Sequence, residues 1–352
     1  MSRFFSKIIT DIDPYVPGEQ PKDKKYIKLN TNENPYPPTD NIYRAIEEAK
    51  RDIRLYPDPE NQNLKNEIAG YYQIEENQVF VGNGSDEVLA FCFLAFFSEK
   101  KIAFADITYS FYPVYAKLLN VEYESIPLCD DFTLDLKRYR ESDLPLIIVN
   151  PNAPTGAYVE IPEIERLLRE KRDRLMIVDE AYIDFGGETC IPLIKNYDNL
   201  LIVQTMSKSR SLAGLRVGFA MGNKELIDGL NKVKNSFNSY TVDRIAEKVA
   251  IEAMKDEDYF NEITKKIMDT RERTIEALEN LKFSVIPSKA NFVFARHPLR
   301  DAEELFHALK ERGILVRYFK RPRIDQYLRI SIGTDEEMAI FIERLTTILK
   351  EE

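Results

Sequence analysis

Short runs of apolar, mostly β-branched residues alternate with amphipathic segments through the first two thirds of this chain. The candidate strands are residues 79–81, 102–105, 146–149, 175–178, 200–204 and 217–221. Segments with helical periodicity, such as residues 162–171, lie between them. Strands that alternate with helices predict a mostly parallel sheet covered by helices on both faces, and uniformly apolar strands fit burial on both sides. The predicted fold class is therefore α/β.

The pattern changes after about residue 224, where long charged amphipathic stretches run to about residue 281. Three separate strand-like pieces follow, at residues 292–295, 314–318 and 327–332. With 352 residues the chain suits two cores. We expect an N-terminal arm at residues 1–40, a large α/β domain at 41–240 and a smaller α+β domain at 241–352. The arm is rich in proline and should pack on the small domain or on a partner subunit.

Charge and composition exclude several classes of protein. The formal net charge is −10, which argues against a nucleic-acid-binding protein. Three widely spaced cysteines and two histidines make a disulfide framework or a metal site improbable. The longest apolar run, residues 88–97, is too short for a bilayer, which needs about 20 residues, and the N-terminus does not resemble a signal peptide. These features favour a cytoplasmic protein with no membrane partner.

Three candidate strands end in polar groups. Residues 146–149 run into Asn-Pro-Asn-Ala-Pro-Thr-Gly at 150–156, residues 175–178 run into Asp179, and residues 200–204 run into Thr205 and then Lys208. Ligands of open α/β sheets bind at the carboxyl ends of the strands. Parallel neighbours would bring these groups to one edge of the sheet.

Such a cluster suits an aldehyde cofactor with a pyridine ring and a phosphate. A desolvated lysine is a nucleophile that can bind an aldehyde, and a buried carboxylate can hold a pyridine nitrogen protonated. Hydroxyl groups beside Lys208, together with Arg216, can hold a phosphate, and so can the Gly-rich turn at residues 82–87. A lone lysine is usually a solvated surface charge, and a lone aspartate at the end of a strand usually caps a turn or helix. The Gly-rich turn by itself is weak evidence for a phosphate site. Together they point to pyridoxal 5'-phosphate.

At these residues the chain resembles the fold-type I pyridoxal-phosphate-dependent aminotransferases. The matching segments are Thr-Met-Ser-Lys-Ser-Arg-Ser-Leu-Ala-Gly at 205–214 with Leu-Arg after it, the Asp-x-x-Tyr of residues 179–182, and the Pro-Thr-Gly of residues 154–156. Within that superfamily the chain is most similar to the histidinol-phosphate aminotransferase family. The similar segments are residues 13–18, 29–35, 54–57, 82–87 and 328–333.

The resemblance implies roles for individual residues. Lys208 would bind the cofactor covalently and carry protons, Asp179 would pair with the ring nitrogen, and Tyr182 would contact the ring oxygen. Tyr109 would stack on the ring, and Tyr56 would reach the phosphate from a neighbouring subunit, which implies a homodimer. The other expected cofactor contacts are Gly84, Ser85, Asp86 (through its backbone N–H), Asn152, Thr205, Ser207 and Arg216, and the expected substrate contacts are Tyr15, Asn32, Arg317 and Arg329.

One position departs from the family pattern. The family usually has asparagine immediately before Pro-Thr-Gly, where its amide bonds the ring oxygen, and this chain has Ala153. Asn152 or Asn150 is a candidate substitute, or Tyr182 acts alone with water. The remaining constellation is complete, so we expect the chain to be active.

The resemblance implies amino transfer between L-histidinol phosphate and 2-oxoglutarate, a step of histidine biosynthesis. Arg317 and Arg329 would bind a phosphate monoester and a dicarboxylate in turn, because guanidinium groups fit both anions. Three alternatives remain open: an aromatic amino-acid aminotransferase, a threonine-phosphate decarboxylase, and a non-catalytic regulator that senses the cofactor. The regulator is disfavoured because such proteins usually carry an added DNA-binding segment.

Overall fold

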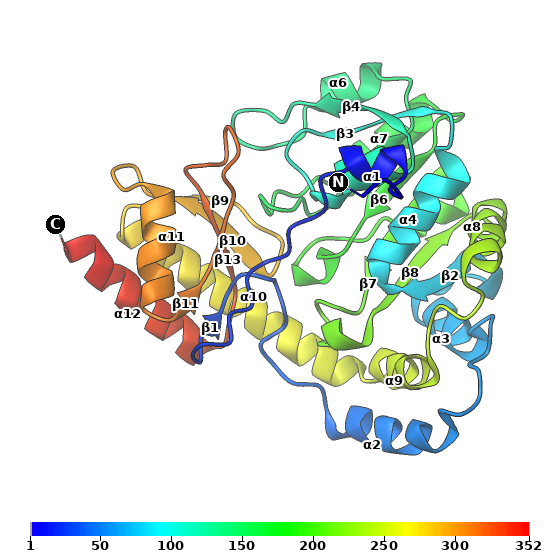
Figure 1. Ribbon diagram of the computed structural model, residues 1–352, viewed down its shortest axis with the longest axis horizontal. Helices are drawn as coiled ribbons and strands as arrows, with labels where there is room; N and C mark the ends of the chain where they lie inside the picture. Colours follow the sequence, from blue (N-terminus) through cyan, green and yellow to red (C-terminus); the bar gives the residue numbers. More distant parts are fainter. Residues whose placement is uncertain (1, 352) are drawn as a thin grey trace.

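The computed structural model describes residues 2–351, which form a larger α/β part and a smaller α+β part side by side (Figure 1). Seven strands form the sheet of the larger part, in the spatial order β2-β8-β7-β6-β5-β3-β4. Their bounds are β2 Val79–Asn83, β3 Lys101–Ala105, β4 Glu122–Ile126, β5 Leu146–Val149, β6 Met176–Asp179, β7 Leu200–Thr205 and β8 Val217–Gly222. The six predicted strands of this part are all present, with ends shifted by up to two residues.

Most neighbours in this sheet are parallel, as expected. In the register of β5, β6 and β7, Asp179 pairs with Val149 on one side and Val203 on the other, so the carboxyl ends of the three strands lie level. Only β8 runs antiparallel to its neighbours β7 and β2. The edge strand β4 was not predicted, because its first four residues are all exposed and three of them are polar or charged, so they lack an apolar pattern.

Alternate residues of the central strands point to two separate apolar layers. Ile147, Ile177 and Leu201 pack on one face, beneath α4 and α8. The residues one position further, such as Ile148 and Val178, pack on the other face with α2, α3, α7 and α9. The helices of this part are α2 Asp40–Ala49, α3 Gln62–Tyr72, α4 Gly84–Phe96, α5 Phe111–Leu118, α6 Leu136–Glu141, α7 Ile161–Glu170, α8 Lys224–Phe237 and α9 Arg244–Lys255.

The smaller part contains an antiparallel sheet of order β12-β13-β10-β9. Its strands are β9 Ser284–Ile286, β10 Phe292–Arg296, β12 Arg317–Tyr318 and β13 Leu328–Ser331, and its helices are α10 Glu257–Asn280, α11 Ala302–Glu311 and α12 Asp335–Lys350. We expected a single strand at residues 314–318, and this prediction was wrong. The segment forms two strands, β11 (Ile314–Leu315) and β12, because the two pieces pair with different partners, β1 and β13.

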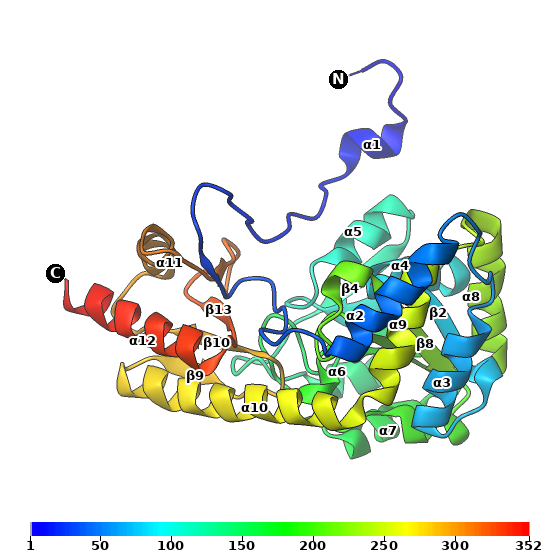
Figure 2. The same cartoon turned by 90° about the horizontal axis from the view of Figure 1, so that it is seen from below.

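The N-terminal segment joins the smaller part. Strand β1 (Ile27–Lys28) pairs in parallel with β11, and Leu29 is buried in the apolar core of the smaller part. Further toward the terminus, α1 (Lys7–Asp11) stands off from the rest of the molecule in Figure 2. In residues 2–351 there is no helix with the length and apolar character needed to span a membrane.

The boundary between the two parts bears on the expected domains. Helix α9 packs against α2 and α3, and Val249 and Ala250 belong to the core of the larger part. A division at residue 240 would cut this cluster. We therefore propose that the division lies after α9, near Asp256, where the chain enters α10.

Candidate active site

A cavity of about 310 Å³ opens at the carboxyl ends of β5, β6 and β7, between the two parts of the molecule. Strands, loops and the N-terminal segment all contribute side chains to it. Of the expected site residues, those that line it are Tyr15, Asn32, Ser85, Asp86, Tyr109, Asp179, Tyr182, Thr205, Ser207, Lys208, Arg216, Arg317 and Arg329. Residues from positions 15 to 329 thus meet in one place, which sequence order alone does not show.

Asp179 ends β6 and is buried at the floor of the cavity. Its Oδ2 accepts a 2.7 Å hydrogen bond from the Tyr112 hydroxyl, and its Oδ1 accepts a 3.1 Å bond from the Ala181 backbone N–H. Burial raises the pKa of this carboxyl group to about 6. No lysine, arginine or histidine within residues 2–351 forms an ion pair with it, so a cationic ring nitrogen would supply the missing countercharge.

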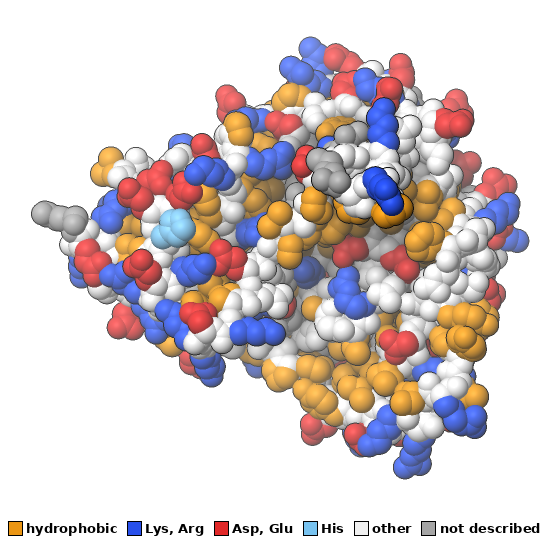
Figure 3. All heavy atoms as spheres, viewed as in Figure 1, with side chains coloured by type: hydrophobic (Ala, Val, Ile, Leu, Met, Phe, Trp, Pro, Cys, Tyr) orange, Lys and Arg blue, Asp and Glu red, His pale blue; other side chains and the backbone are white. Residues whose placement is uncertain are grey.

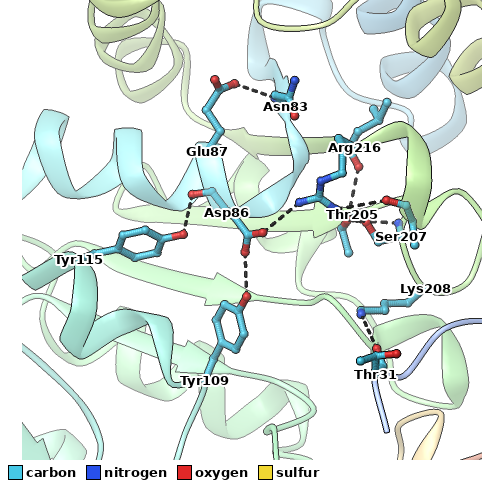
Figure 4. Close-up of polar contacts among 12 residues, drawn as sticks. Thr31, Asn83, Asp86, Glu87, Tyr109, Tyr115, Thr205, Ser207, Lys208 and Arg216 are labelled. Carbon is cyan, nitrogen blue, oxygen red and sulfur yellow. Dashed lines mark hydrogen bonds and ion pairs between the residues drawn. The ribbon is translucent and has the colours of Figure 1, made fainter. Parts of the chain in front are cut away.

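Lys208 follows β7 and directs its amine toward the N-terminal segment (Figure 4). Its Nζ donates a 3.3 Å hydrogen bond to the backbone oxygen of Thr31. Burial lowers the pKa of Lys208 to about 8, and the positive charge of Arg329 acts in the same direction. A larger fraction of this amine is therefore unprotonated at neutral pH than for an exposed lysine, which favours nucleophilic attack.

Arg216 and three hydroxyl groups form the anion-binding end of the cavity. The Arg216 guanidinium donates to Asp86 Oδ2 at 2.9 Å and to Ser207 Oγ at 3.4 Å, and Thr205 Oγ1 donates to Ser207 Oγ at 3.0 Å. Ser85 completes this end of the cavity at the start of α4. These donors suit a phosphate group.

Backbone geometry makes room for this arginine. Gly84 has a φ of +78°, and a Cβ there would lie 2.5 Å from Arg216 Nη2. Gly218 faces the same turn, since its Cβ would lie 2.2 Å from the Ser85 backbone nitrogen. Gly84 thus acts through its conformation, and its lack of a side chain lets Arg216 lie over the turn.

Asp86 is held by two side chains as well as by its place in α4. Its Oδ1 accepts a 2.7 Å bond from the Tyr109 hydroxyl, and its backbone oxygen accepts from the Tyr115 hydroxyl at 2.9 Å (Figure 4). We expected only the backbone N–H of Asp86 to serve the site. Its carboxylate is also engaged, because it neutralises Arg216 and fixes the position of Tyr109.

Tyr182 belongs to a buried chain of hydrogen bonds. Asn32 Nδ2 donates to the Tyr182 hydroxyl at 3.1 Å, and Ser331 Oγ donates to Asn32 Oδ1 at 2.8 Å. The Tyr182 oxygen acts as acceptor here, so its own proton stays available for a ring oxygen. Burial also raises the pKa of Tyr182, which keeps that proton in place. Asn32 lines the cavity, and one of its two amide N–H groups is used by Tyr182.

The structure places the two asparagines near Ala153 away from the cavity. Asn152 Nδ2 donates to the Ile107 backbone oxygen at 3.1 Å and to Thr155 Oγ1 at 3.0 Å. Asn150 bonds both backbone groups of Val159, at 2.8 and 2.9 Å. Ala153 itself lines the cavity, and these two neighbours do not. The expected cofactor contact of Asn152 is thus corrected, because its amide is used to shape the loop.

Two arginines of the smaller part line the cavity. Arg329 Nη2 donates to the Asn30 backbone oxygen at 2.7 Å, and its buried Nε has no partner among residues 2–351. Arg317 donates to the backbone oxygens of Pro17 at 3.1 Å and Val16 at 2.9 Å. The unpaired Nε of Arg329 points to an anion that would accept from it.

Tyr56 is the expected site residue that lies farthest from this arrangement. It is 75% exposed, and its ring stacks on Tyr240 with centroids 4.6 Å apart. The backbone oxygen of Tyr56 accepts a 2.6 Å bond from Arg244, which holds the loop in place. Within one chain Tyr56 does not reach the cavity, so any contact with the phosphate must come from another subunit.

Several residues at or next to the site were missed by the sequence reasoning. Tyr112 of α5 is one, because its hydrogen bond to Asp179 depends on how α5 packs and no sequence pattern distinguishes it from its aromatic neighbours. The loop between β12 and β13 contributes Phe319, Arg321 and Ile324. The signal there is five cationic residues within 317–329 of an acidic chain. No metal-type cluster of His, Cys, Asp or Glu was found in the part of the chain that the structure describes.

Comparison with known proteins identifies the family. Residues 24–345 match the family model described as aminotransferase class I and II. The chain is 54% identical over 351 residues to the histidinol-phosphate aminotransferase of Clostridium botulinum (strain Hall), covering 99% of each chain. It is 57% identical over 347 residues to that of Clostridium acetobutylicum, covering 98% of this chain and 99% of the relative.

A solved structure supports the fold. The histidinol-phosphate aminotransferase of Sinorhizobium meliloti, in complex with pyridoxal 5'-phosphate, superposes with a TM-score of 0.89 at 24% identity and covers 99% of this chain and 98% of that chain. The expected fold-type I architecture is therefore confirmed, as is the resemblance read from the motifs. This chain belongs to the aminotransferase class I and II family.

Proposed function

We propose that this protein transfers the amino group of L-histidinol phosphate to 2-oxoglutarate, giving imidazole acetol phosphate and glutamate, with pyridoxal 5'-phosphate as cofactor. One observation carries the proposal: Lys208, Asp179 and Arg329 line a single cavity, which unites a nucleophilic amine, a buried carboxylate and an anion-binding group. The relatives at 54% and 57% identity are named histidinol-phosphate aminotransferases, which supports this substrate.

The residues of the cavity fit the cofactor. Asp179 is a buried carboxylate that lacks a cationic side-chain partner among the described residues, and Arg216 with its neighbouring hydroxyls suits a phosphate. When bound, pyridoxal 5'-phosphate supplies an aldehyde for amines and a ring that withdraws electrons from the substrate carbon. Asp179 would hold the ring nitrogen protonated, and Tyr182 would donate to the ring oxygen.

Lys208 would have two tasks at this site. It would hold the cofactor covalently in the absence of substrate, and its Nζ would remove the proton from the amine-bearing carbon of the substrate. Its lowered pKa of about 8 suits both tasks, because a base works best when its pKa lies near the working pH. Tyr109 would cover the ring and keep water from it.

Arg329 would bind the anionic groups of both substrates in turn. Its unpaired Nε and its place above the rings of Phe292 and Phe319 leave part of the guanidinium facing the cavity. A guanidinium can donate two parallel hydrogen bonds to a phosphate or a carboxylate. Arg317 and Tyr15 would close the outer end, and Asn32 would act on substrate through its hold on Tyr182.

The active unit would be a homodimer. Large apolar side chains that are exposed in the single chain include Ile53, Leu55, Tyr56, Phe237 and Tyr240. Figure 3 shows hydrophobic side chains gathered on the lower part of one face. Exposed apolar patches of this kind mark protein contacts. We propose that a second copy covers this surface and that Tyr56 contacts the cofactor phosphate in its partner's cavity.

We also propose that the enzyme works in the cytoplasm. Cys92, Cys129 and Cys190 are free thiols in this structure, which suits a reducing compartment. The protein would have small-molecule partners only, an amino donor and a 2-oxo acid, with no metal. It would bind neither nucleic acid, because its net charge is −10, nor a membrane.

A panel of amino donors tests the proposal against its rivals. The pyridoxal form of the enzyme is mixed with histidinol phosphate, tyrosine, phenylalanine or threonine phosphate, and conversion to the pyridoxamine form is followed by absorbance. Stoichiometric conversion by histidinol phosphate, much faster than by the others, is expected. Faster conversion by tyrosine or phenylalanine would show that the protein is an aromatic amino-acid aminotransferase. Release of carbon dioxide from threonine phosphate would show that it is a decarboxylase. No reaction with any of these compounds would favour a regulator.

A further inference from the structure

Three arginines form one wall of the cavity. Arg317, Arg321 and Arg329 come from β12, β13 and the loop between them, and all three line the cavity. None of them forms an ion pair with a carboxylate among residues 2–351, although the chain carries ten more acidic than basic side chains. A positive wall without acidic partners in an acidic protein indicates a site for an anion.

The three guanidinium groups differ in how far they are already engaged. Arg329 lies deepest, close enough to Lys208 that its charge is, after burial, the largest influence that lowers the pKa of that amine. Arg317 donates from both terminal nitrogens to the backbone oxygens of Val16 and Pro17. Arg321 is exposed at the mouth, and its guanidinium has no hydrogen bond to any described residue.

The loop that carries Arg321 is nevertheless firmly placed. The next residue but one, Arg323, donates to Asp106 Oδ2 at 2.8 Å and to the backbone oxygens of Leu128 at 2.8 Å and Cys129 at 3.0 Å. Ile324 is buried in an apolar cluster that includes Leu128. These contacts bind the loop of the smaller part to the larger part, so Arg321 is held at the mouth of the cavity.

The two proposed substrates differ in how far their anionic groups lie from the reacting carbon. In a 2-oxo acid the nearest carboxylate is attached directly to the reacting carbon. In histidinol phosphate that carboxylate is absent, and the phosphorus lies three bonds from the reacting carbon, through CH₂ and oxygen. If both groups point in the same direction from the reacting carbon, the phosphate of histidinol phosphate therefore extends further toward the mouth of the cavity than the carboxylate of the 2-oxo acid.

We infer that Arg321 is a donor-specific phosphate ligand: it contacts the phosphate of the amino donor and does not contact the carboxylate beside the reacting carbon of the 2-oxo acid. The inference rests on the proposed function. Arg329 serves both substrates at the deeper position, and Arg321 adds a second guanidinium that only the longer group reaches. It thereby selects phosphorylated donors over amino acids.

The test measures the two half-reactions of the cofactor-loaded enzyme separately by absorbance. In Arg321→Gln, the apparent Kd for histidinol phosphate should rise about 10-fold, the loss expected for one charge-assisted contact at an accessible site. The limiting rate should change less than about twofold, because the reacting groups are untouched. The apparent Kd values for histidinol, which lacks the phosphate, and for 2-oxoglutarate should stay unchanged.

Lys320→Gln is the matched control. Lys320 lies next to Arg321, its side chain is 78% exposed and paired with Glu303, and the substitution removes the same charge. It should change none of these constants. The inference is overturned if Arg321→Gln changes the constants no more than Lys320→Gln does. It is also overturned if Arg321→Gln weakens the binding of 2-oxoglutarate as much as the binding of histidinol phosphate. Wild-type enzyme that does not react with histidinol phosphate would instead refute the proposed function, and the inference with it.

Discussion

The Tyr112 hydroxyl donates a 2.7 Å hydrogen bond to Asp179 Oδ2, and both side chains are buried. Tyr112 comes from α5 and Asp179 from the end of β6, so the bond ties a covering helix to the floor of the active site. It also lowers the pKa of Asp179, against the stronger effect of burial, and so favours the carboxylate form that a protonated ring nitrogen requires.

Tyr112→Phe should reduce kcat about 10-fold, because a hydrogen bond to a charged group contributes roughly 1.5–3 kcal/mol. The pKa of Asp179 should rise further, so the acidic limb of the kcat profile should move to higher pH. The control is Tyr139→Phe: Tyr139 is equally buried, but its hydroxyl has no partner in residues 2–351. An acidic limb that stays in place in Tyr112→Phe would contradict this role.

Asp179→Asn should stabilise the cofactor-free protein while destroying its activity. The folded pKa of Asp179 is about 6, above its ordinary value of 3.8, so the native state binds more protons in that interval and stability falls as pH rises through it. Removing the charge should raise the free energy of unfolding at pH 7 by about 1–3 kcal/mol. Amino transfer should fall roughly 100-fold or more.

Urea unfolding of wild type and Asp179→Asn, measured at pH 7 and well below pH 3.8, checks the stability part. At a pH well below 3.8 the aspartate is protonated in both the folded and the unfolded state, so the difference should vanish. Equal destabilisation of the variant at both pH values would show that the carboxylate is not strained by burial.

The rate at which the cofactor-free enzyme binds pyridoxal 5'-phosphate covalently should rise with pH, with a midpoint near pH 8. The reason is that burial lowers the pKa of Lys208 to about 8, and only the unprotonated amine attacks an aldehyde. Stopped-flow absorbance between pH 6 and 10 gives the profile. A midpoint near 10.5, the value of an ordinary lysine, would refute the desolvated environment, and Lys208→Ala should show no covalent binding.

Arg329→Ala should slow both half-reactions, since we propose that this guanidinium binds each substrate's anionic group. It should also move the midpoint of covalent cofactor binding to higher pH, because the charge of Arg329 lowers the pKa of Lys208. Single-turnover kinetics with histidinol phosphate and with 2-oxoglutarate measure the first effect. A loss confined to one substrate would mean that the deep anion position is not shared.

Mixed dimers test the proposed contribution of Tyr56. Tyr56→Ala and Lys208→Ala should each be inactive or nearly so as homodimers. If Tyr56 acts on the partner's site, a dimer of the two variants has one intact site, and random mixing should restore about one quarter of the wild-type sites. Activity that is not restored after mixing, with dimers demonstrated by light scattering, would place Tyr56 outside the active site.

Strands that are buried on both faces could be predicted from the sequence of the segment alone. Residues 146–149 are buried on both sides, so an unbroken apolar run was sufficient to identify β5. The groups after such strands, Asp179 and Lys208, could be placed together because parallel strands share an edge. The Tyr112–Asp179 bond could not, because it depends on how α5 packs. The same holds for Asn152, whose amide turns to the Ile107 backbone, a partner 45 residues away in sequence.

The pairing of β1 with β11 has a consequence for synthesis of the chain. Ile27 is made almost 290 residues before its partner Ile314, at a rate of roughly 5–20 residues per second. Strand β1 therefore has no strand partner until β11 has been synthesised. Since Thr31 and Asn32 reach the cavity from this same segment and Arg329 lines its other side, the catalytic pocket cannot be complete before the smaller part has been synthesised.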